Sequence, residues 1–209
     1  MKSNMGVTVQ SIEKVKNKRY KVCMDNGTYL ILYTGELQKY GLKENVSLPE
    51  EQYRELYYEI FGKRVKKRAL ALLEKMDRTE KNLREKLSQN GYPEDLIEDA
   101  ILYVKRYHYI DDERYADQYI AYRQKQKSAL QLRQELMRKG IDRAVIERAM
   151  EQEYDSDDRE KILLFLKKKG YEPEQTDRSR QQKIYASLMR RGFRSEDILS
   201  CMKCGDYLT

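Results

Sequence analysis

Apolar residues along this chain follow two different periods, one before and one after residue 66. In the first region, residues 7–16, 19–24 and 28–33 are rich in β-branched and aromatic residues, which favours strands. Asp25, Asn26 and Gly27 join the last two segments, and Asn and Gly tolerate the positive φ angles of a tight hairpin turn. The pattern predicts a small antiparallel sheet, followed by helical segments at residues 34–42 and 47–61.

The second region contains a threefold repeat with a helical period. Windows 83–101, 132–150 and 184–202 align on Gly91, Gly140 and Gly192, which lie about 50 residues apart. Apolar residues stand eight and four positions before each glycine, directly after it, and again near the end of the window. These positions hold Leu83, Leu132 and Ile184; Leu87, Leu136 and Leu188; Tyr92, Ile141 and Phe193; Ile97, Ile146 and Ile198; Ala100, Ala149 and Cys201; and Ile101, Met150 and Met202.

Apolar residues four apart form a stripe on a helix, and the glycine ends that helix in the left-handed C′ position. A second helix follows each glycine, and a further amphipathic helix precedes each window at residues 68–76, 114–124 and 159–168. We therefore predict a mainly α protein, in which three tandem three-helix repeats form an elongated curved rod behind the small antiparallel sheet with its helix. The predicted domains are residues 1–65 (sheet plus helix) and the helical repeats 66–110, 111–156 and 157–209.

Carboxylates gather just after His108, the single histidine of the chain. Asp111, Asp112 and Glu113 could belong to a metal site, an acid–base pair or the start of a helix. They stand directly before the apolar positions of a new helix, where carboxylates cap free amides and oppose the positive helix terminus. A metal site would lack a second histidine. The pattern is therefore interpreted as a helix start.

Other candidate chemistry is weak. Cys201 and Cys204 have zinc-like spacing, but Cys201 occupies the small position that Ala100 and Ala149 occupy in the other repeats, which predicts core packing. The sequence contains neither a phosphate-binding glycine-rich loop nor a Ser-His-Asp or Cys-His set. The acidic residues 155–160 are interpreted as a solvated helix start. We expect no catalytic residue, metal or cofactor, and no enzyme activity.

Charge points to a macromolecular partner. Charged residues make up 37% of the 209 residues and the net charge is +7, but residues 111–160 are net acidic between basic flanks. This distribution suits simultaneous contact with DNA and with a protein surface. Eighteen tyrosines against three phenylalanines are expected mainly to pack, with stacking on unpaired bases as the alternative. The sequence shows no signal peptide, long apolar run or lipidation motif, so a cytoplasmic protein is expected.

Basic residues near the ends of the repeat helices are candidate contacts to phosphate. Cations at a helix C-terminus are also favourable for structural reasons, so each of them alone is weak support. Together they could form one basic edge that binds DNA without sequence preference. The candidate filament and DNA contacts are Arg84, Lys86, Arg123, Lys125, Lys127, Arg133, Arg138, Lys139, Arg190, Arg191 and Arg194.

Residues 109–116, YIDDERYA, together with the repeated L-x3-L-x3-G pattern, resemble the RecX family of recombination regulators. The resemblance covers residues 66–209, and the amino-terminal sheet with residues 37–48 is similar to the extension of Gram-positive members. The matching signature positions, interpreted as structural, are Asp111, Asp112, Arg114, Tyr115, Ala116, Gly91, Gly140 and Gly192.

The resemblance implies a non-enzymatic regulator that binds RecA–DNA filaments, acts in the SOS response and in DNA repair and recombination, and mostly inhibits RecA ATPase activity and filament extension. A monomer that contacts single- or double-stranded DNA, with no membrane, is expected. Two alternatives remain. Three helix–turn–helix-like units could bind bare DNA without RecA, or the acidic segment 147–160 could dock a basic partner without any DNA contact.

Overall fold

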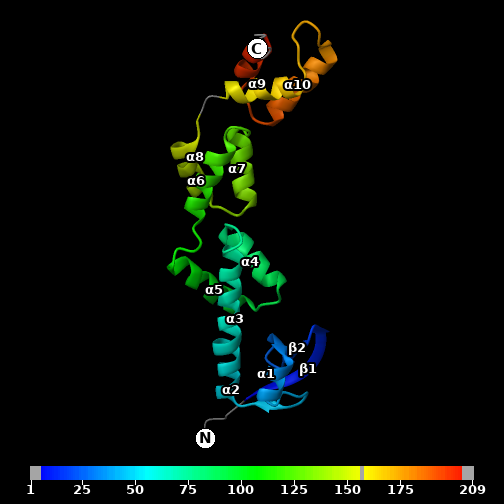
Figure 1. Cartoon of the computed structure of the whole chain (residues 1–209), viewed down its shortest axis with the longest axis vertical. Coiled ribbons are helices and arrows are strands. Elements are labelled where there is room, and N and C mark those ends of the chain that lie inside the picture. The colour runs from blue at the N-terminus through cyan, green and yellow to red at the C-terminus, as the bar shows by residue number, and fades with distance from the viewer. Residues whose placement is uncertain (1–5, 156–157, 204–209) are drawn as a thin grey trace. The chain divides into compact units, whose positions relative to one another are not determined.

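The computed structural model describes residues 6–155 and 158–203. The chain divides into two compact units, of which the first ends at Asp111 and the second begins at Asp112. Figure 1 shows the strands in blue, near the amino-terminus, and helices along the rest of the chain. Among the described residues, no helix is long and apolar enough to cross a membrane.

The sheet is antiparallel, with strand order β3-β2-β1-β4. Its strands are β1 (Val7–Lys16), β2 (Arg19–Met24), β3 (Tyr29–Tyr33) and β4 (Ser47–Leu48). The predicted sheet is thus confirmed, and so is the turn between β2 and β3, where Gly27 has a φ of 81°. Strand β4 was not predicted; its two residues were assigned to the helical segment 47–61, and that assignment is wrong, because two residues are too short to show a period.

The predicted helical segments are present, but the second differs in type. Helix α1 (Thr34–Lys39) follows the sheet, and α2 (Glu50–Arg54), a π-helix (Glu55–Gly62) and α3 (Lys63–Leu73) follow one another without a break. Leu56 and Phe61 are five residues apart and both are fully buried. Five-residue spacing of core positions matches the i→i+5 hydrogen bonding of a π-helix, which explains the departure from the expected α-helix.

The three predicted repeats of three helices are confirmed. The first consists of α3, α4 (Glu80–Gln89) and α5 (Glu94–Arg106). The second consists of α6 (Asp112–Arg123), α7 (Ala129–Arg138) and α8 (Arg143–Glu153). The third consists of α9 (Arg159–Lys168), α10 (Arg178–Arg190) and α11 (Ser195–Lys203).

The middle helix of each repeat ends at its aligned glycine in the same way. The φ angles of Gly91, Gly140 and Gly192 are 80°, 88° and 86°. In the first repeat, the N–H of Gly91 donates to the carbonyl of Ser88 at 2.8 Å and the N–H of Tyr92 donates to that of Leu87 at 3.4 Å. The other two glycines show the same pair of bonds. This is the Schellman motif, and it requires the left-handed conformation that glycine adopts without strain.

The described residues form three hydrophobic clusters. One extends from Val7 to Ile110 and joins the sheet to the first repeat, and the second and third repeats each have their own. The expected boundary between residues 65 and 66 falls inside α3, so that division stays a prediction. Cys201 is buried in the third cluster, as predicted, whereas Cys204 lies outside the described residues.

Candidate functional site

The acidic motif before α6 is a helix start, as predicted. Helix α6 begins at Asp112, with Asp112 and Glu113 in its first turn. Glu113 forms an ion pair with Arg148 of α8, and Ala116 is fully buried. His108 has a φ of 55°, and its N–H donates to the carbonyl of Lys105 at 2.9 Å. It therefore takes, at the end of α5, the left-handed position that glycine takes after the middle helices.

The candidate cations of the first repeat, Arg84 and Lys86, lie on α4. The guanidinium of Arg84 is 2.9 Å from the carboxylate of Glu80 and 2.7 Å from that of Glu98 on α5. The hydrogen bond to Glu98 is the largest cause of a raised pKa of Arg84. Lys86 donates to the side-chain oxygen of Gln89 at 3.1 Å. Arg84 therefore has its charge compensated by two carboxylates and joins α4 to α5.

In the second repeat, Lys127 and Tyr119 both donate hydrogen bonds to the carboxylate of Glu135 on α7. Burial raises the pKa of Glu135, but the hydrogen bonds from Lys127 and Tyr119 outweigh it and lower the pKa below its usual value. Burial, followed by the hydrogen bond to Glu135, raises the pKa of Tyr119 to about 12. The ammonium group of Lys139 lies 5.4 Å from the ring centre of Tyr115 and 5.2 Å from that of Tyr119.

The remaining candidate cations of the second repeat differ in their surroundings. Arg133 is ion-paired with Glu147 of α8 at 3.0 Å. Arg123 lies over the ring of Tyr122, with 5.3 Å between guanidinium carbon and ring centre. Arg138 is exposed and donates to the backbone carbonyl of Gln134 at 3.3 Å. Lys125 is exposed in the loop between α6 and α7. Within the described residues, the structure thus separates Lys127 and Arg133, which bind carboxylates internally, from Lys125, which does not.

The second unit brings that loop next to the glycine turn of the third repeat. The hydroxyl of Ser128, at the start of α7, donates to the backbone carbonyl of Arg191. A Cβ atom at Gly192 would lie only 2.5 Å from Cβ of Leu130. The start of α7 and the turn after α10 therefore meet at one place, although more than sixty residues separate them in the chain. We call this contact, together with the cations that flank it in the chain, the basic junction; these cations are Arg123, Lys125, Lys127, Arg190, Arg191 and Arg194.

The exposed cations of the basic junction can accept an anion. Arg190 and Arg194 are exposed like Lys125, and in the described part of the chain none of the three forms an ion pair. Arg191 instead lies over the ring of Phe165, with 4.6 Å between guanidinium carbon and ring centre. Exposed guanidinium and ammonium groups bind phosphate oxygens through charge-assisted hydrogen bonds. This junction suits a sequence-independent contact to a phosphate backbone.

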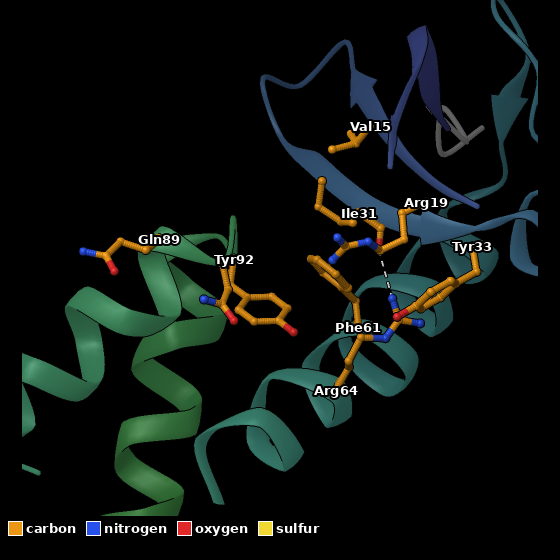
Figure 2. A pocket seen from close by; sticks show the side chains of 9 residues that line it. Val15, Arg19, Ile31, Tyr33, Phe61, Arg64, Gln89 and Tyr92 are labelled. Atoms are coloured by element: carbon orange, nitrogen blue, oxygen red, sulfur yellow. Dashed lines mark hydrogen bonds between the residues drawn. The ribbon is translucent and has the colours of Figure 1, made fainter. Parts of the chain in front are cut away.

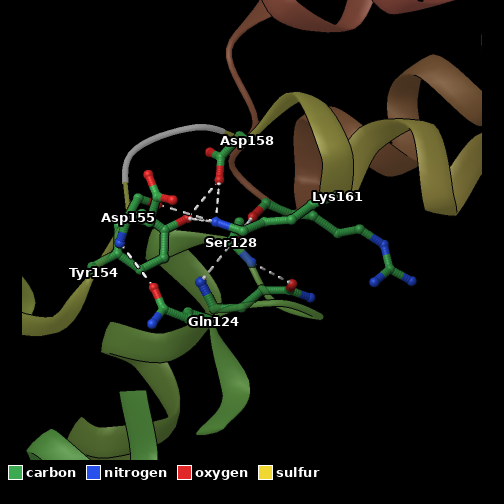
Figure 3. A network of polar contacts seen from close by, with 8 residues as sticks. Gln124, Ser128, Tyr154, Asp155, Asp158 and Lys161 are labelled. Carbon is green, nitrogen blue, oxygen red and sulfur yellow. Dashed lines mark hydrogen bonds and ion pairs between the residues drawn. The ribbon is translucent and has the colours of Figure 1, made fainter. Parts of the chain in front are cut away.

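A second polar cluster, between α8 and α9, was not predicted (Figure 3). The side chain of Lys161 is only 7% exposed, and its ammonium group bonds to Asp158 at 2.8 Å and to the hydroxyl of Tyr154 at 2.9 Å. Tyr154 also donates to Asp158 at 2.6 Å, and burial followed by this bond raises the pKa of Tyr154. Asp158 is therefore used internally instead of being fully solvated, which corrects part of our interpretation of residues 155–160. The cluster anchors the start of α9 to the end of α8.

A small antiparallel sheet followed by three tandem three-helix repeats defines a helical repeat protein, with basic groups where two repeats meet. Family models match three segments of the chain. Residues 66–103 match the first three-helix domain of RecX, residues 111–150 the second and residues 156–202 the third. These matches cover more than half of the chain, which therefore belongs to the RecX family.

Relatives match this chain over nearly its whole length. The regulatory protein RecX of Clostridium botulinum (strain Eklund 17B / Type B) is 26% identical over 200 residues, which cover 94% of each chain. That of Caldanaerobacter subterraneus subsp. tengcongensis is 28% identical and covers 90% of this chain and 93% of its own.

A crystal structure of regulatory protein RecX matches with a TM-score of 0.65 and 25% identity, covering 95% of this chain and all of that one. RecX from Lactobacillus salivarius matches with a TM-score of 0.59 and 26% identity, covering 70% of this chain and 97% of that one. The matches support a regulatory role for the chain.

Proposed function

We propose that this protein is a non-catalytic regulator of RecA filaments on DNA, which binds the filament and mostly inhibits ATP hydrolysis and filament extension. Through this activity it would act in DNA repair, recombination and the SOS response. The observation that carries the proposal is the basic junction, where Lys125, Arg190 and Arg194 are exposed. The net acidic stretch 111–160 and the basic flanks provide complementary charge for both a protein and a nucleic acid.

The first experiment measures RecA ATP hydrolysis on single-stranded DNA with substoichiometric amounts of this protein. Hydrolysis is expected to fall at concentrations that are too low to coat the DNA. DNA binding by the protein alone is measured in parallel at several salt concentrations. Unaffected hydrolysis together with tight binding to bare DNA would contradict the proposal and favour three tandem DNA-binding units that act without RecA.

A charge-reversal variant tests the basic junction itself. The variant carries Lys125→Glu, Arg190→Glu and Arg194→Glu, which break no ion pair in the described structure. If each residue contacts one phosphate, the slope of log affinity for single-stranded DNA against log salt should weaken by about 2. Inhibition of RecA should weaken with it, because the reversed charges repel the phosphate backbone.

The matched control changes the same number of charges at exposed residues outside the junction, namely Arg143→Glu, Lys167→Glu and Arg178→Glu. Arg143 and Arg178 start α8 and α10, where acidic residues oppose the positive helix terminus, so the control should remain folded. Equal loss in both triple variants would show that only overall charge matters. Full inhibition by a correctly folded junction variant would remove these three residues from the proposal.

A further inference from the structure

The first unit contains a cavity of about 400 Å³, which is within the size range of small-molecule sites. It lies where the turn after α4 approaches the sheet and the π-helix. Figure 2 shows Arg19 and Tyr92 reaching into the same space from opposite sides. Its walls include Arg19, Ile31, Tyr33, Phe61, Arg64 and Tyr92.

Aromatic faces dominate one part of this cavity. The rings of Phe61 and Tyr92 lie 5.4 Å apart at an angle of 54°, and Tyr33 is 46% exposed. Within the described residues, the hydroxyl of Tyr92 makes no hydrogen bond, although burial raises the pKa of this group. Stacking of an unpaired base on such a ring is worth about 1–3 kcal/mol and tolerates any base.

Arginines form the other part. Arg64 is held in place, because it donates to the carbonyl of Ile31 at 2.9 Å, pairs with Glu36, and lies over Tyr33 at 5.0 Å and Phe61 at 5.6 Å. Among the described residues, the side chain of Arg19 makes one hydrogen bond, a long one of 3.5 Å to the backbone carbonyl of Lys16. Glu36 balances the positive charge of Arg64, and the charge of Arg19 remains. The cavity therefore carries a net positive charge, which attracts an anion.

We propose that this cavity binds one nucleotide of single-stranded DNA, with the base against Tyr33 and Tyr92 and the phosphate against Arg19. Flat aromatic faces, combined with a guanidinium that has no carboxylate partner in the described part of the chain, fit a nucleotide better than an acidic side chain, which offers no ring to stack. The inference deepens the proposed function by naming a second contact to the DNA. It does not depend on the basic junction, because the cavity belongs entirely to the first unit.

The test uses the full-length protein and a thymidine oligonucleotide that carries 5-iodouracil, which crosslinks to stacked aromatic rings when irradiated. The crosslinked peptides are identified by mass spectrometry, without RecA present. Crosslinks to Tyr33 or Tyr92 are expected. Arg19→Ala should lower the yield of this crosslink about tenfold, in line with the loss of a stacking or phosphate contact. Lys43→Ala removes one exposed cation of the same unit outside the cavity and should leave the yield unchanged.

Tyr33→Phe should keep the crosslink, because the stacking ring remains, whereas Tyr33→Ala should lower it. Crosslinks confined to residues 112–203, or an Arg19→Ala yield equal to that of Lys43→Ala, would overturn the proposal. Unlabelled thymidine monophosphate and an unlabelled thymidine oligonucleotide are compared as competitors of the crosslink. A DNA strand is the ligand if the oligonucleotide competes at much lower concentration, and a free nucleotide is the ligand if the two compete equally. The unaltered protein and the same variants are then assayed for inhibition of RecA. If the crosslink forms in the cavity but the protein does not inhibit RecA, the proposed function is refuted and the nucleotide site is not.

Discussion

Gly192→Ala is expected to destabilise the second unit far more than the same change at another left-handed glycine of the third repeat. Gly192 has a φ of 86°, and an added Cβ would meet Cβ of Leu130 at 2.5 Å and its Cδ2 at 2.7 Å. Gly170 is the comparison. It has a φ of 57°, and its added Cβ would meet only the end of the Arg180 side chain, at an ordinary 3.7 Å.

The two effects at Gly192 can be estimated separately. A left-handed conformation costs an alanine about 1–2 kcal/mol. Overpacking adds about 1–3 kcal/mol, because Cβ of Leu130 belongs to the first turn of α7 and cannot rotate away. We expect a loss of about 3 kcal/mol in the free energy of unfolding for Gly192→Ala, and of about 1 kcal/mol for Gly170→Ala.

Urea denaturation followed by far-ultraviolet circular dichroism measures both losses, with unchanged m-values as the check on a common unfolding transition. A double-variant cycle then tests the contact. Leu130→Gly alone should cost about 1 kcal/mol in helix propensity. Combined with Gly192→Ala, it should recover about 1–2 kcal/mol relative to the sum of the two single losses. Equal losses at Gly192 and Gly170, with an additive cycle, would refute the close approach of the two repeats.

Three further predictions concern single side chains. Asn17 and Lys18 both have positive φ in the two-residue turn between β1 and β2. Because glycine adopts this conformation without strain and lysine does not, Lys18→Gly should raise the free energy of unfolding by about 1 kcal/mol in urea denaturation. The pKa of Tyr119 is raised to about 12 in the folded state, so the folded protein holds a proton that the unfolded chain loses above pH 10. The free energy of unfolding should therefore fall between pH 10 and 12 more steeply in the unaltered protein than in Tyr119→Phe. An equal fall in both proteins would contradict this prediction. Lys161→Ala should cost about 3 kcal/mol by leaving Asp158 without its cation, whereas exposed Lys167→Ala should cost little in the same denaturation assay.

The sequence alone was sufficient for the repeat architecture, because the signals are local. Apolar residues at helical spacing followed by a glycine specify a helix, its buried face and its end within one short window. Leu87, Leu136 and Leu188 are all fully buried, as the alignment predicts, and the three glycines share one hydrogen-bond pattern. The helix start at Asp112 was predicted for the same reason, since capping depends on neighbours in the chain.

Tertiary structure alone decided the state of each charge. Arg84, Lys127 and Arg133 look in the sequence like Lys125 and Arg190, yet the first three bind carboxylates of another element and the last two are exposed without an ion pair in the described structure. An ion pair requires two side chains within about 4 Å, and helical periodicity does not encode distances between separate helices. The same limit hid buried Lys161, the approach of Gly192 to Leu130, and the cavity beside Arg19. Each of these depends on how separate elements pack in space.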